Sequence, residues 1–478
     1  MSTTKAPAAV PGAVGTAAAE QPAPRGLLPV VLVATFMSAL DFFIVNVAIP
    51  SVQRDLHAGA SAIQWVMAGY SLALAGGLIT AGRLGDLLGR RRMFSLGLGL
   101  FTAASAACGL ATGPAFLIAA RVVQGLGAAL MGPQVLALLR TSFHGAAQAR
   151  AFAQYALTMG LGAVLGQLIG GLLIRADLFG TDWRACFLIN VPVGLVTLLL
   201  VPRAVPESRA PQRPSLDLLG VVLVTAALVT LALPLIQGRS SGWPLWTWIC
   251  LGASALLWAA LARHQVRLAG RDGSPLVHPH LFRARAFSAG MLAQLAFWLG
   301  QASFFLILAV YLQQGRGLDA LGSGLVFTAL GVGYLATSLC ADRVAARLGH
   351  QAVTLGAVLM ALGLAGLWLT VNSGAPGTAW LVPALVLDGL GMGLVIAPLT
   401  TSVLVGVPAH LVGSASGSVA TVQQVGGALG VALIGILFYG AGSVGSGFQA
   451  GLVALTVLEL VLAATVQLLP KPAQGAGA

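Results

Sequence analysis

Four charged side chains lie well inside long apolar segments of this sequence: Asp41, Arg121, Asp388 and Glu459. A charge inside a membrane-crossing helix costs roughly 2.5–3.5 kcal/mol or more, so such residues are candidates for function by default. Carboxylates at these depths suit the binding and release of protons, and we assign Asp41, Asp388 and Glu459 to proton coupling. For Asp388 and Glu459, selection of cationic substrates is the alternative, and Glu459 could equally face a polar contact between peripheral helices.

Asp41 and Arg121 lie at similar depths. At ~1.5 Å per residue, Asp41 is about 14 Å below the outer end of its predicted helix, and Arg121 is about 9 Å below the outer end of its own. A buried ion pair between them is therefore geometrically possible. The alternative to a proton-coupling role is a permanent ion pair that only sets the register of the two helices.

The composition identifies a polytopic membrane protein. Charged residues make up 8% and hydrophobic residues 58% of the chain, whereas soluble domains carry about a quarter charged residues. The net charge of +12 comes from short basic clusters between apolar runs, which favours topology signals over nucleic-acid binding. Cys108, Cys186, Cys250 and Cys340 lie in separate runs without paired metal-ligand spacing, so neither a metal site nor a disulfide framework is predicted.

A helix needs roughly 20 apolar residues to cross the hydrocarbon core, and fourteen runs of that order are present. We place them at 27–50, 62–82, 94–112, 115–139, 151–174, 185–202, 217–236, 246–262, 287–312, 323–341, 353–372, 380–404, 417–439 and 448–469. The fold class is therefore an all-α polytopic membrane protein with fourteen spans.

Basic residues in alternate connections predict the orientation. Eighteen lie on one side and five on the other, so the first side is assigned to the cytoplasm together with both termini. Residues 1–25, rich in Ala and Pro, are predicted to be a disordered cytoplasmic tail, and 471–478 a C-terminal tail. The expected location is the bacterial inner (plasma) membrane.

A short turn between the second and third runs combines glycine with charge. Gly82, Asp86, Gly89, Arg90 and Arg91 lie there. Glycine lets two helix ends approach closely, and Asp86 is able to accept hydrogen bonds from arginine or from a helix N-terminus. An arginine cluster that only sets topology is the alternative. The block resembles the signature loop of the major facilitator superfamily, which implies a cytoplasmic gate made of these five residues.

Other motifs resemble the fourteen-helix drug:proton antiporter branch of that superfamily. The segment 40–50 around Asp41 is similar to its first-helix motif. The segment 121–129 is similar to the superfamily's fourth-helix motif, whose arginine is associated with proton coupling, and this resemblance implies the same role for Arg121. The segment 160–171 resembles the antiporter signature of the fifth helix, with Gln167 where proline is usual. Small residues there favour close packing, and we assign Gly162, Gly166, Gly170 and Gly171 to a helix-packing hinge.

A weak repeat predicts the domain organisation. The segment 340–349 keeps an acid, arginines and a glycine and follows the tenth run, as the signature loop follows the second. Two six-helix halves would place these loops six spans apart, so two extra helices must separate the halves. The resemblance implies the major facilitator fold, divided into a six-helix bundle at 26–203, two linker helices within 204–285 and a second six-helix bundle at 286–470.

Polar and aromatic side chains within the runs are candidates for a substrate cavity. They are Asn46, Trp65, Tyr70, Gln124, Gln167, Phe297, Phe304 and Gln424. No nucleophile and base share a motif, so catalytic residues, metal ligands and enzyme activity are not predicted. The alternative for the aromatic residues is ordinary core packing or the membrane interface.

We interpret the chain as a proton-coupled secondary transporter that exports lipophilic, cationic or drug-like small molecules by alternating access. Its coupling ion is the proton, it needs no cofactor, and its partners are a small-molecule substrate and the lipid bilayer. It is expected to be monomeric, without nucleic acid. Alternatives are a proton-coupled importer or lipid transporter on the same scaffold, and a transport-inactive membrane sensor.

Overall fold

The chain forms a bundle of long α-helices, seen here in a computed structural model. The structure describes residues 26–469, except 210–215, 272–274, 375–376, 405–406 and 409–410, and no strand occurs among them. The all-helical class predicted from the apolar runs is therefore confirmed for the described part of the chain. The predicted tails at 1–25 and 471–478 lie outside the described residues.

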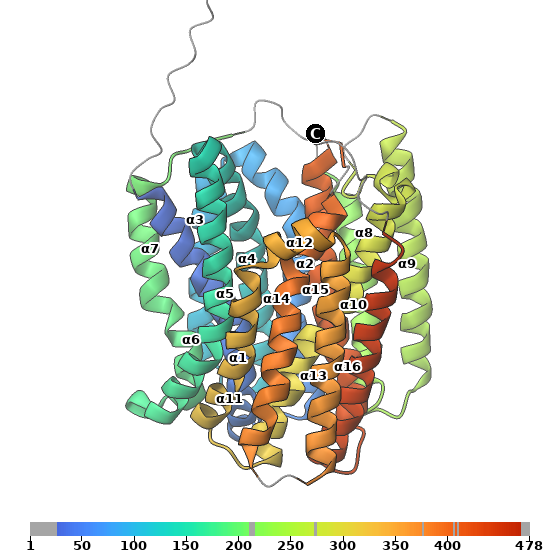
Figure 1. The fold of residues 1–478 in the computed structure, drawn as a ribbon. Helices are drawn as coiled ribbons and strands as arrows, with labels where there is room; N and C mark the ends of the chain where they lie inside the picture. Colours follow the sequence, from blue (N-terminus) through green and yellow to red (C-terminus); the bar gives the residue numbers. More distant parts are fainter. Residues whose placement is uncertain are drawn as a thin grey trace, which may run out of the picture.

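The helices follow one another along the chain as shown in Figure 1. They are α1 (Leu27–Asp55), α2 (Ala60–Leu88), α3 (Arg90–Gly109), α4 (Pro114–Ser142), α5 (Gly145–Ala176), α6 (Ala185–Leu188), α7 (Asn190–Ala204), α8 (Leu218–Gln237), α9 (Leu245–Ala269), α10 (Arg285–Val310), α11 (Ala320–Ser338), α12 (Ala341–Leu348), α13 (Gln351–Asn372), α14 (Val382–Leu404), α15 (Val412–Phe438) and α16 (Val444–Val466). Short 3-10 turns are Leu178–Gly180, Asp182–Arg184, Pro279–Arg283 and Thr378–Leu381, and a π-helical turn, η4, spans Tyr311–Gly315.

Twelve of the described helical segments are long and apolar enough to cross a membrane. The bent helix α2 becomes a thirteenth when its parts Ala60–Leu78 and Thr80–Leu88 are taken together. Helix α3, which begins with three arginines, is not among them. The predicted count of fourteen is therefore not confirmed, although helices exist at all fourteen predicted places.

The helices pack in two groups with a hairpin beside them. Helices α1 to α7 contact one another, as do α10 to α16, while α2 meets α15 and α5 meets α11 between the groups. The α8–α9 hairpin lies at one side of the bundle in Figure 1, where α8 contacts both α2 and α15. The hairpin therefore bridges the two groups.

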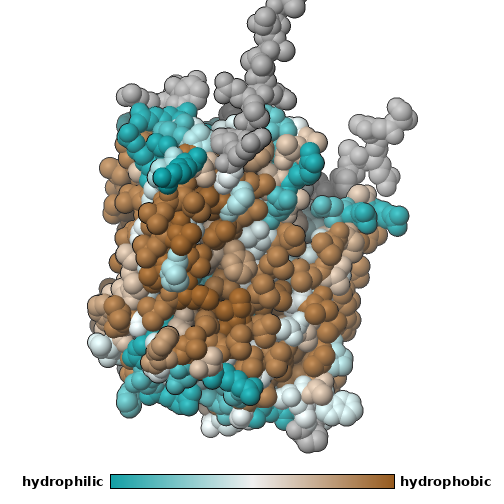
Figure 2. Space-filling view, turned by 90° about the vertical axis from the view of Figure 1, so that its left-hand side faces the viewer, coloured by the Kyte–Doolittle hydropathy of each residue, from teal (hydrophilic) through white to brown (hydrophobic). Residues whose placement is uncertain are grey.

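The outer surface carries an apolar belt. In Figure 2 a brown band separates teal regions at the two ends of the bundle. Large apolar side chains such as Leu199, Leu256 and Leu369 are exposed on the helices, as expected of helices that face lipid. We call the end at which α2 passes into α3 the basic end, because Arg90, Arg91 and Arg92 begin α3 there.

Glycines bring α5 against α1 around the level of Asp41. A Cβ atom added at Gly162 would lie 2.6 Å from the Cβ of Ala39, and one at Gly170 would lie 2.7 Å from Cγ1 of Ile44. Gly166 faces the carbonyl of Leu40 in the same row. Gly171 points elsewhere, toward the backbone of Ala320 at the start of α11. Three of the four predicted hinge glycines therefore share one contact with α1.

This close approach makes α5 sensitive to added volume. We expect Gly162→Val to lower stability by about 1–3 kcal/mol, because overpacking a tight contact forces helices apart. Thermal unfolding of the detergent-solubilised protein measures the effect. Gly99→Val in α3 is the matched control, since a Cβ at Gly99 meets nothing within 4 Å. Equal melting temperatures for the two variants would contradict the tight α1–α5 contact.

Candidate functional site

Asp41 and Arg121 form an ion pair in the interior of the first helix group. The Asp41 Oδ2 atom lies 2.6 Å from Nη1 of Arg121. The other carboxylate oxygen, Oδ1, accepts hydrogen bonds from Nε2 of Gln124 at 2.7 Å and from Nδ2 of Asn190 at 2.9 Å. The Asp41 and Arg121 side chains are 0% and 1% exposed, so these partners take the place of water around the carboxylate.

Further groups complete the surroundings of the pair. Ser105 in α3 accepts hydrogen bonds from Gln124 at 2.6 Å and Asn190 at 3.2 Å. The Arg121 guanidinium donates to Oε1 of Gln124 at 2.6 Å and to the carbonyl of Val66 at 3.3 Å. Five helices, α1, α2, α3, α4 and α7, therefore meet at one polar cluster.

An aromatic ring covers the arginine. Cζ of Arg121 lies 4.2 Å from the ring centroid of Tyr70 and 5.7 Å from that of Phe187. A guanidinium over an aromatic face is attracted by the ring quadrupole, more strongly where water is excluded. Tyr70 and Gln124, predicted as cavity residues, thus contact the ion pair itself.

Asp388 and Glu459 lie in the second helix group. They are 0% and 1% exposed. Among the described residues, both carboxylate oxygens of Asp388 and Oε2 of Glu459 have no hydrogen-bond partner. Their helices, α14 and α16, both pack on α13. The structure does not bring either residue into the cluster around Asp41.

The turn predicted as a gate is built on Gly89. This residue ends α2 and precedes α3 with φ 114°, a conformation that glycine adopts without strain. Asp86 and Arg90 form an ion pair at 2.9 Å across the turn. The linker after α7 adds Glu207, whose Oε1 accepts the backbone N–H of Arg91 at 3.1 Å.

Glu207 thus caps the positive end of α3, where a carboxylate is favourable. Its Oε2 also lies 3.9 Å from Nε of Arg91 and 3.8 Å from Nε of Arg92. The Arg90 N–H donates to the carbonyl of Ser208 at 2.9 Å. Sequence reasoning missed Glu207, because nothing in a linker sequence indicates which distant helix it contacts.

A large cavity reaches from the basic end into the bundle. Its volume is about 1150 Å³, and it is lined by residues of α1, α2, α4, α5 and α15. The gate residues Gly82, Asp86 and Arg90 lie in its wall, together with Gln424 from the predicted cavity set. Leu74, on the same wall, comes from the middle of α2. The space is large enough for a drug-sized molecule.

The opposite end is held closed by contacts between the helix groups. Gln313 donates to the carbonyl of Val47 at 3.0 Å, and Gln314 donates to Oε1 of Gln53 at 2.8 Å. Gln64 of α2 donates to the carbonyl of Val431 in α15 at 3.1 Å. The cavity is therefore accessible from the basic end and blocked at the other.

A small enclosed space of about 30 Å³ lies between α1, α2, α10 and α14, with Phe43 and Trp298 in its wall. Asn46, a predicted cavity residue, lines this space. Its Oδ1 atom and Oε1 of Gln301 are buried, and neither has a partner in the described part of the chain. Two helix groups thus present unpaired acceptors to one aromatic space.

The remaining predicted cavity residues lie elsewhere. Trp65 packs among α2, α8 and α15, and Phe297 and Phe304 belong to the buried core around α10. Gln167 is buried where α5 meets α11, and both polar atoms of its amide lack a partner among the described residues. Helical periodicity marks such positions as inward-facing but does not distinguish a cavity wall from a packed core.

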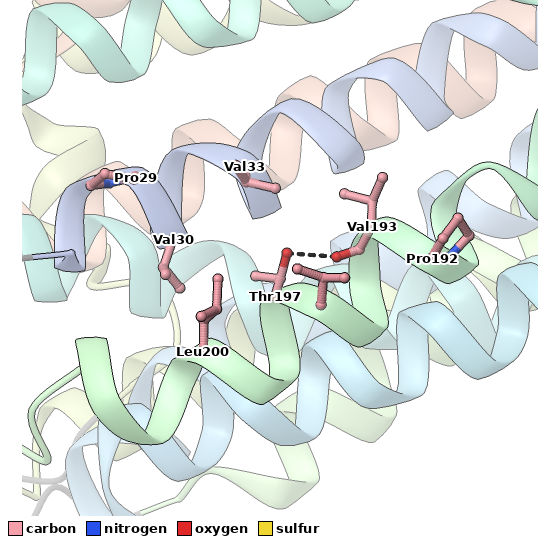
Figure 3. Close-up of a pocket in the computed structure, with 8 residues that line it drawn as sticks. Pro29, Val30, Val33, Pro192, Val193, Thr197 and Leu200 are labelled. Carbon is pink, nitrogen blue, oxygen red and sulfur yellow. Dashed lines mark hydrogen bonds between the residues drawn. The ribbon is translucent and has the colours of Figure 1, made fainter.

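An apolar groove lies between α1 and α7 (Figure 3). Its volume is about 390 Å³, and Val33, Val196 and Leu200 line it. Thr197 also lines the groove, and its hydroxyl group donates within α7 to the carbonyl of Val193 at 2.7 Å. No residue of this groove belongs to the large cavity.

A second polar cluster joins the two helices of the α8–α9 hairpin. Asp217 accepts hydrogen bonds from the Gly220 N–H at 2.8 Å, from His264 at 2.7 Å and from Gln265 at 2.7 Å. Burial raises the pKa of Asp217, but these hydrogen bonds outweigh it and leave that pKa below its usual value. These contacts of the carboxylate join α8 to α9.

The linker after α9 contacts both helix groups. The Pro275 carbonyl accepts a hydrogen bond from Arg83 of α2 at 2.6 Å. The Leu276 carbonyl accepts one from Ser414 of α15 at 3.3 Å, and Leu276 also lines the large cavity. The extra hairpin is thus connected to the wall of the cavity on both sides.

Comparisons with known proteins agree with this architecture. The chain is 41% identical over 435 residues to a probable actinorhodin transporter of Streptomyces coelicolor, covering 90% of this chain and 75% of that protein. It is 36% identical over 421 residues to a tetracenomycin C resistance and export protein of Streptomyces glaucescens, covering 87% of this chain and 76% of that protein.

A solved structure shares the fold. The crystal structure of a POT family transporter in complex with 5-aminolevulinic acid matches with a TM-score of 0.69 and 16% identity, covering 94% of this chain and 97% of that chain. A sequence profile described as Major Facilitator Superfamily matches residues 31–431. The chain therefore belongs to the Major Facilitator Superfamily.

Proposed function

We propose that this protein exports drug-like small molecules in exchange for protons, by alternating access across the bacterial plasma membrane. Relatives named as antibiotic transport and export proteins support the export of such compounds. The observation that most supports proton exchange is the ion pair of Asp41 and Arg121, which is buried among helices that must move together. The cycle needs protons as the coupling ion and no cofactor, and one chain suffices for it.

The basic end is the cytoplasmic end in this proposal. Arg90, Arg91 and Arg92 lie there, and arginine-rich connections favour the cytoplasmic side of a membrane. The chain termini then both lie in the cytoplasm. The large cavity faces the compartment from which an exporter collects its substrate.

The division into two six-helix bundles, 26–203 and 286–470, with an insertion at 204–285, is part of the proposal. The contacts within α1 to α7 and within α10 to α16 support it, as does the position of the α8–α9 hairpin beside both groups. We include α3 as a fourteenth span, because it packs against α4 and α7, which flank it in the bundle.

Coupling follows from the electrostatics of the pair. Removing one partner of a buried ion pair typically costs about 3–5 kcal/mol, because the other charge is left without compensation. Protonation of Asp41 from outside removes its negative charge, so Arg121 loses its main partner and the surrounding helices rearrange. Release of the proton inside restores the pair. Each charge state of the pair favours the conformation that is open to one side of the membrane. Substrate is therefore released on a given side only while the pair is in the charge state that favours opening to that side.

Asp388 and Glu459 are proposed as further proton-binding groups. Neither makes an ion pair in the described part of the chain. A buried carboxylate without a cation or hydrogen-bond donor is far more stable with a proton than without one. Each is thus suited to carry a proton between the two sides.

The gate is proposed to act through the turn at Gly89. Asp86 and Arg90 face the cavity, and Glu207 joins the same turn to the linker that leaves the first helix group. A change in the spacing of α2 and α3 must therefore alter contacts on both sides of the turn. We assign Gly82 and Arg91 to this gate as well.

We expect Asp41→Asn to abolish drug-induced proton movement in proteoliposomes. Because the variant leaves Arg121 unpaired and could fail to fold, the double variant Asp41→Asn with Arg121→Gln is tested beside it, since it buries no charge. The double variant should fold, bind drug and move no protons. Proton movement at the wild-type rate in a folded double variant would contradict the coupling role of the pair.

We expect Asp86→Asn to favour the conformation open at the basic end, because it breaks the ion pair with Arg90. Ser416→Cys, on the exposed wall of the cavity, reports access to a membrane-impermeant thiol reagent once Cys250 and Cys340 are replaced by alanine. Labelling should become faster. Asp342→Asn on α12 is the control, since that residue does not line the cavity. Unchanged labelling would contradict the gating role of Asp86, and the arginines of the turn would then serve only to set the topology.

A further inference from the structure

The wall of the large cavity carries few negative charges. Among its described lining residues, the acidic one is Asp86, whereas Arg83, Arg90 and Arg140 are basic. Asp86 is already paired with Arg90 at 2.9 Å. A cationic molecule entering from the basic end therefore meets no carboxylate that lacks a partner.

The deeper acids do not supply one either. Both oxygens of Asp41 are occupied by Arg121, Gln124 and Asn190. Asp388 and Glu459 are fully buried, and neither lines the cavity. The sequence-based expectation of cationic substrates depended on such acids facing the cavity, and in this conformation they do not.

Arg140 is different from the other charged groups of the wall. It lies in the last turn of α4 and is exposed. Its guanidinium makes no hydrogen bond or ion pair within the described part of the chain, although its backbone carbonyl accepts from Gln148 at 2.9 Å. Guanidinium groups pair with carboxylates through two parallel hydrogen bonds. Arg140 is thus available to an anionic ligand.

Most of the surrounding wall is apolar. Leu78, Met131, Phe152 and Met159 lie on it with Leu74. Low-dielectric walls concentrate the field of charges at the mouth of a cleft and raise the local concentration of the opposite charge. A lipophilic molecule that carries a negative charge matches both properties.

On this basis, and resting on the proposed export function, we propose that the cavity takes lipophilic anions, such as aromatic compounds with a carboxylate or phenolate group. Arg140 is the positioning residue that attracts the charged group at the mouth. The apolar wall holds the ring system. The proposal concerns the charge of the substrate and leaves proton exchange at Asp41 unchanged.

Two dyes built on the same xanthene ring system test the charge preference. Fluorescein is the anionic probe and rhodamine 6G the cationic probe, and binding to the purified protein in uncharged-lipid nanodiscs is followed by fluorescence anisotropy at pH 8. At 20 mM salt we expect the Kd of fluorescein to be roughly three- to tenfold lower than that of rhodamine 6G. At 0.5 M salt the ratio of the two Kd values should approach one, because salt screens the attraction.

Variants then locate the charge responsible. Arg140→Gln should weaken fluorescein binding by roughly two- to fivefold, as expected for loss of one partly screened charge, and leave rhodamine 6G binding unchanged. Arg140→Lys should retain most of the affinity. Arg150→Gln is the matched control, because this arginine is exposed on α5, outside the cavity wall. Equal effects of Arg140→Gln and Arg150→Gln would show that Arg140 acts in topology only.

Tighter binding of rhodamine 6G, equal binding of both dyes at low salt, or binding of neither would overturn the proposal. The export function is tested separately, by proton-driven drug uptake into inside-out vesicles. Uptake of rhodamine 6G that requires Asp41 would support export and overturn only the anion preference. Absence of any proton-driven uptake would overturn the export function itself.

Discussion

The ion pair of Asp41 and Arg121 is the constraint on which the first helix group depends. Two charges without water require each other and further hydrogen-bond donors to be stable. Gln124 and Asn190 supply those donors, so α1, α4 and α7 must meet at one level. The glycines of α5 let α1 reach that position. A change in the charge of one carboxylate therefore acts on several helices at once.

The second helix group is organised differently. Asp388 and Glu459 are equally buried but lack ionic partners in the described residues. The two groups touch through α2 with α15 and α5 with α11, and the contacts of Gln313 and Gln314 close one end. The extra α8–α9 hairpin is a third part of the bundle. Hydrogen bonds to Asp217 join its two helices, and the linker after α9 connects it to the cavity wall.

Much of this arrangement follows from the sequence, and the rest depends on contacts that one sequence does not reveal. Apolar runs predict the helices, and similar depth along two of them makes a contact between Asp41 and Arg121 geometrically possible. Ser105 and Glu207 were missed because a small polar residue in an apolar run, or an acid in a linker, does not indicate its distant partner. Phe297 and Phe304 illustrate the converse problem, since inward-facing aromatic residues pack in cores as readily as they line cavities.

Infrared difference spectroscopy of the carboxyl groups tests the role of Asp41 most directly. The purified protein in nanodiscs is exposed to alternating acidic and alkaline buffer, and the carbonyl stretch of protonated carboxylic acids is recorded. The account predicts a band that appears on acidification, is absent from the double variant Asp41→Asn with Arg121→Gln, and changes when drug binds. A spectrum without any band that depends on Asp41 would contradict proton exchange at this ion pair.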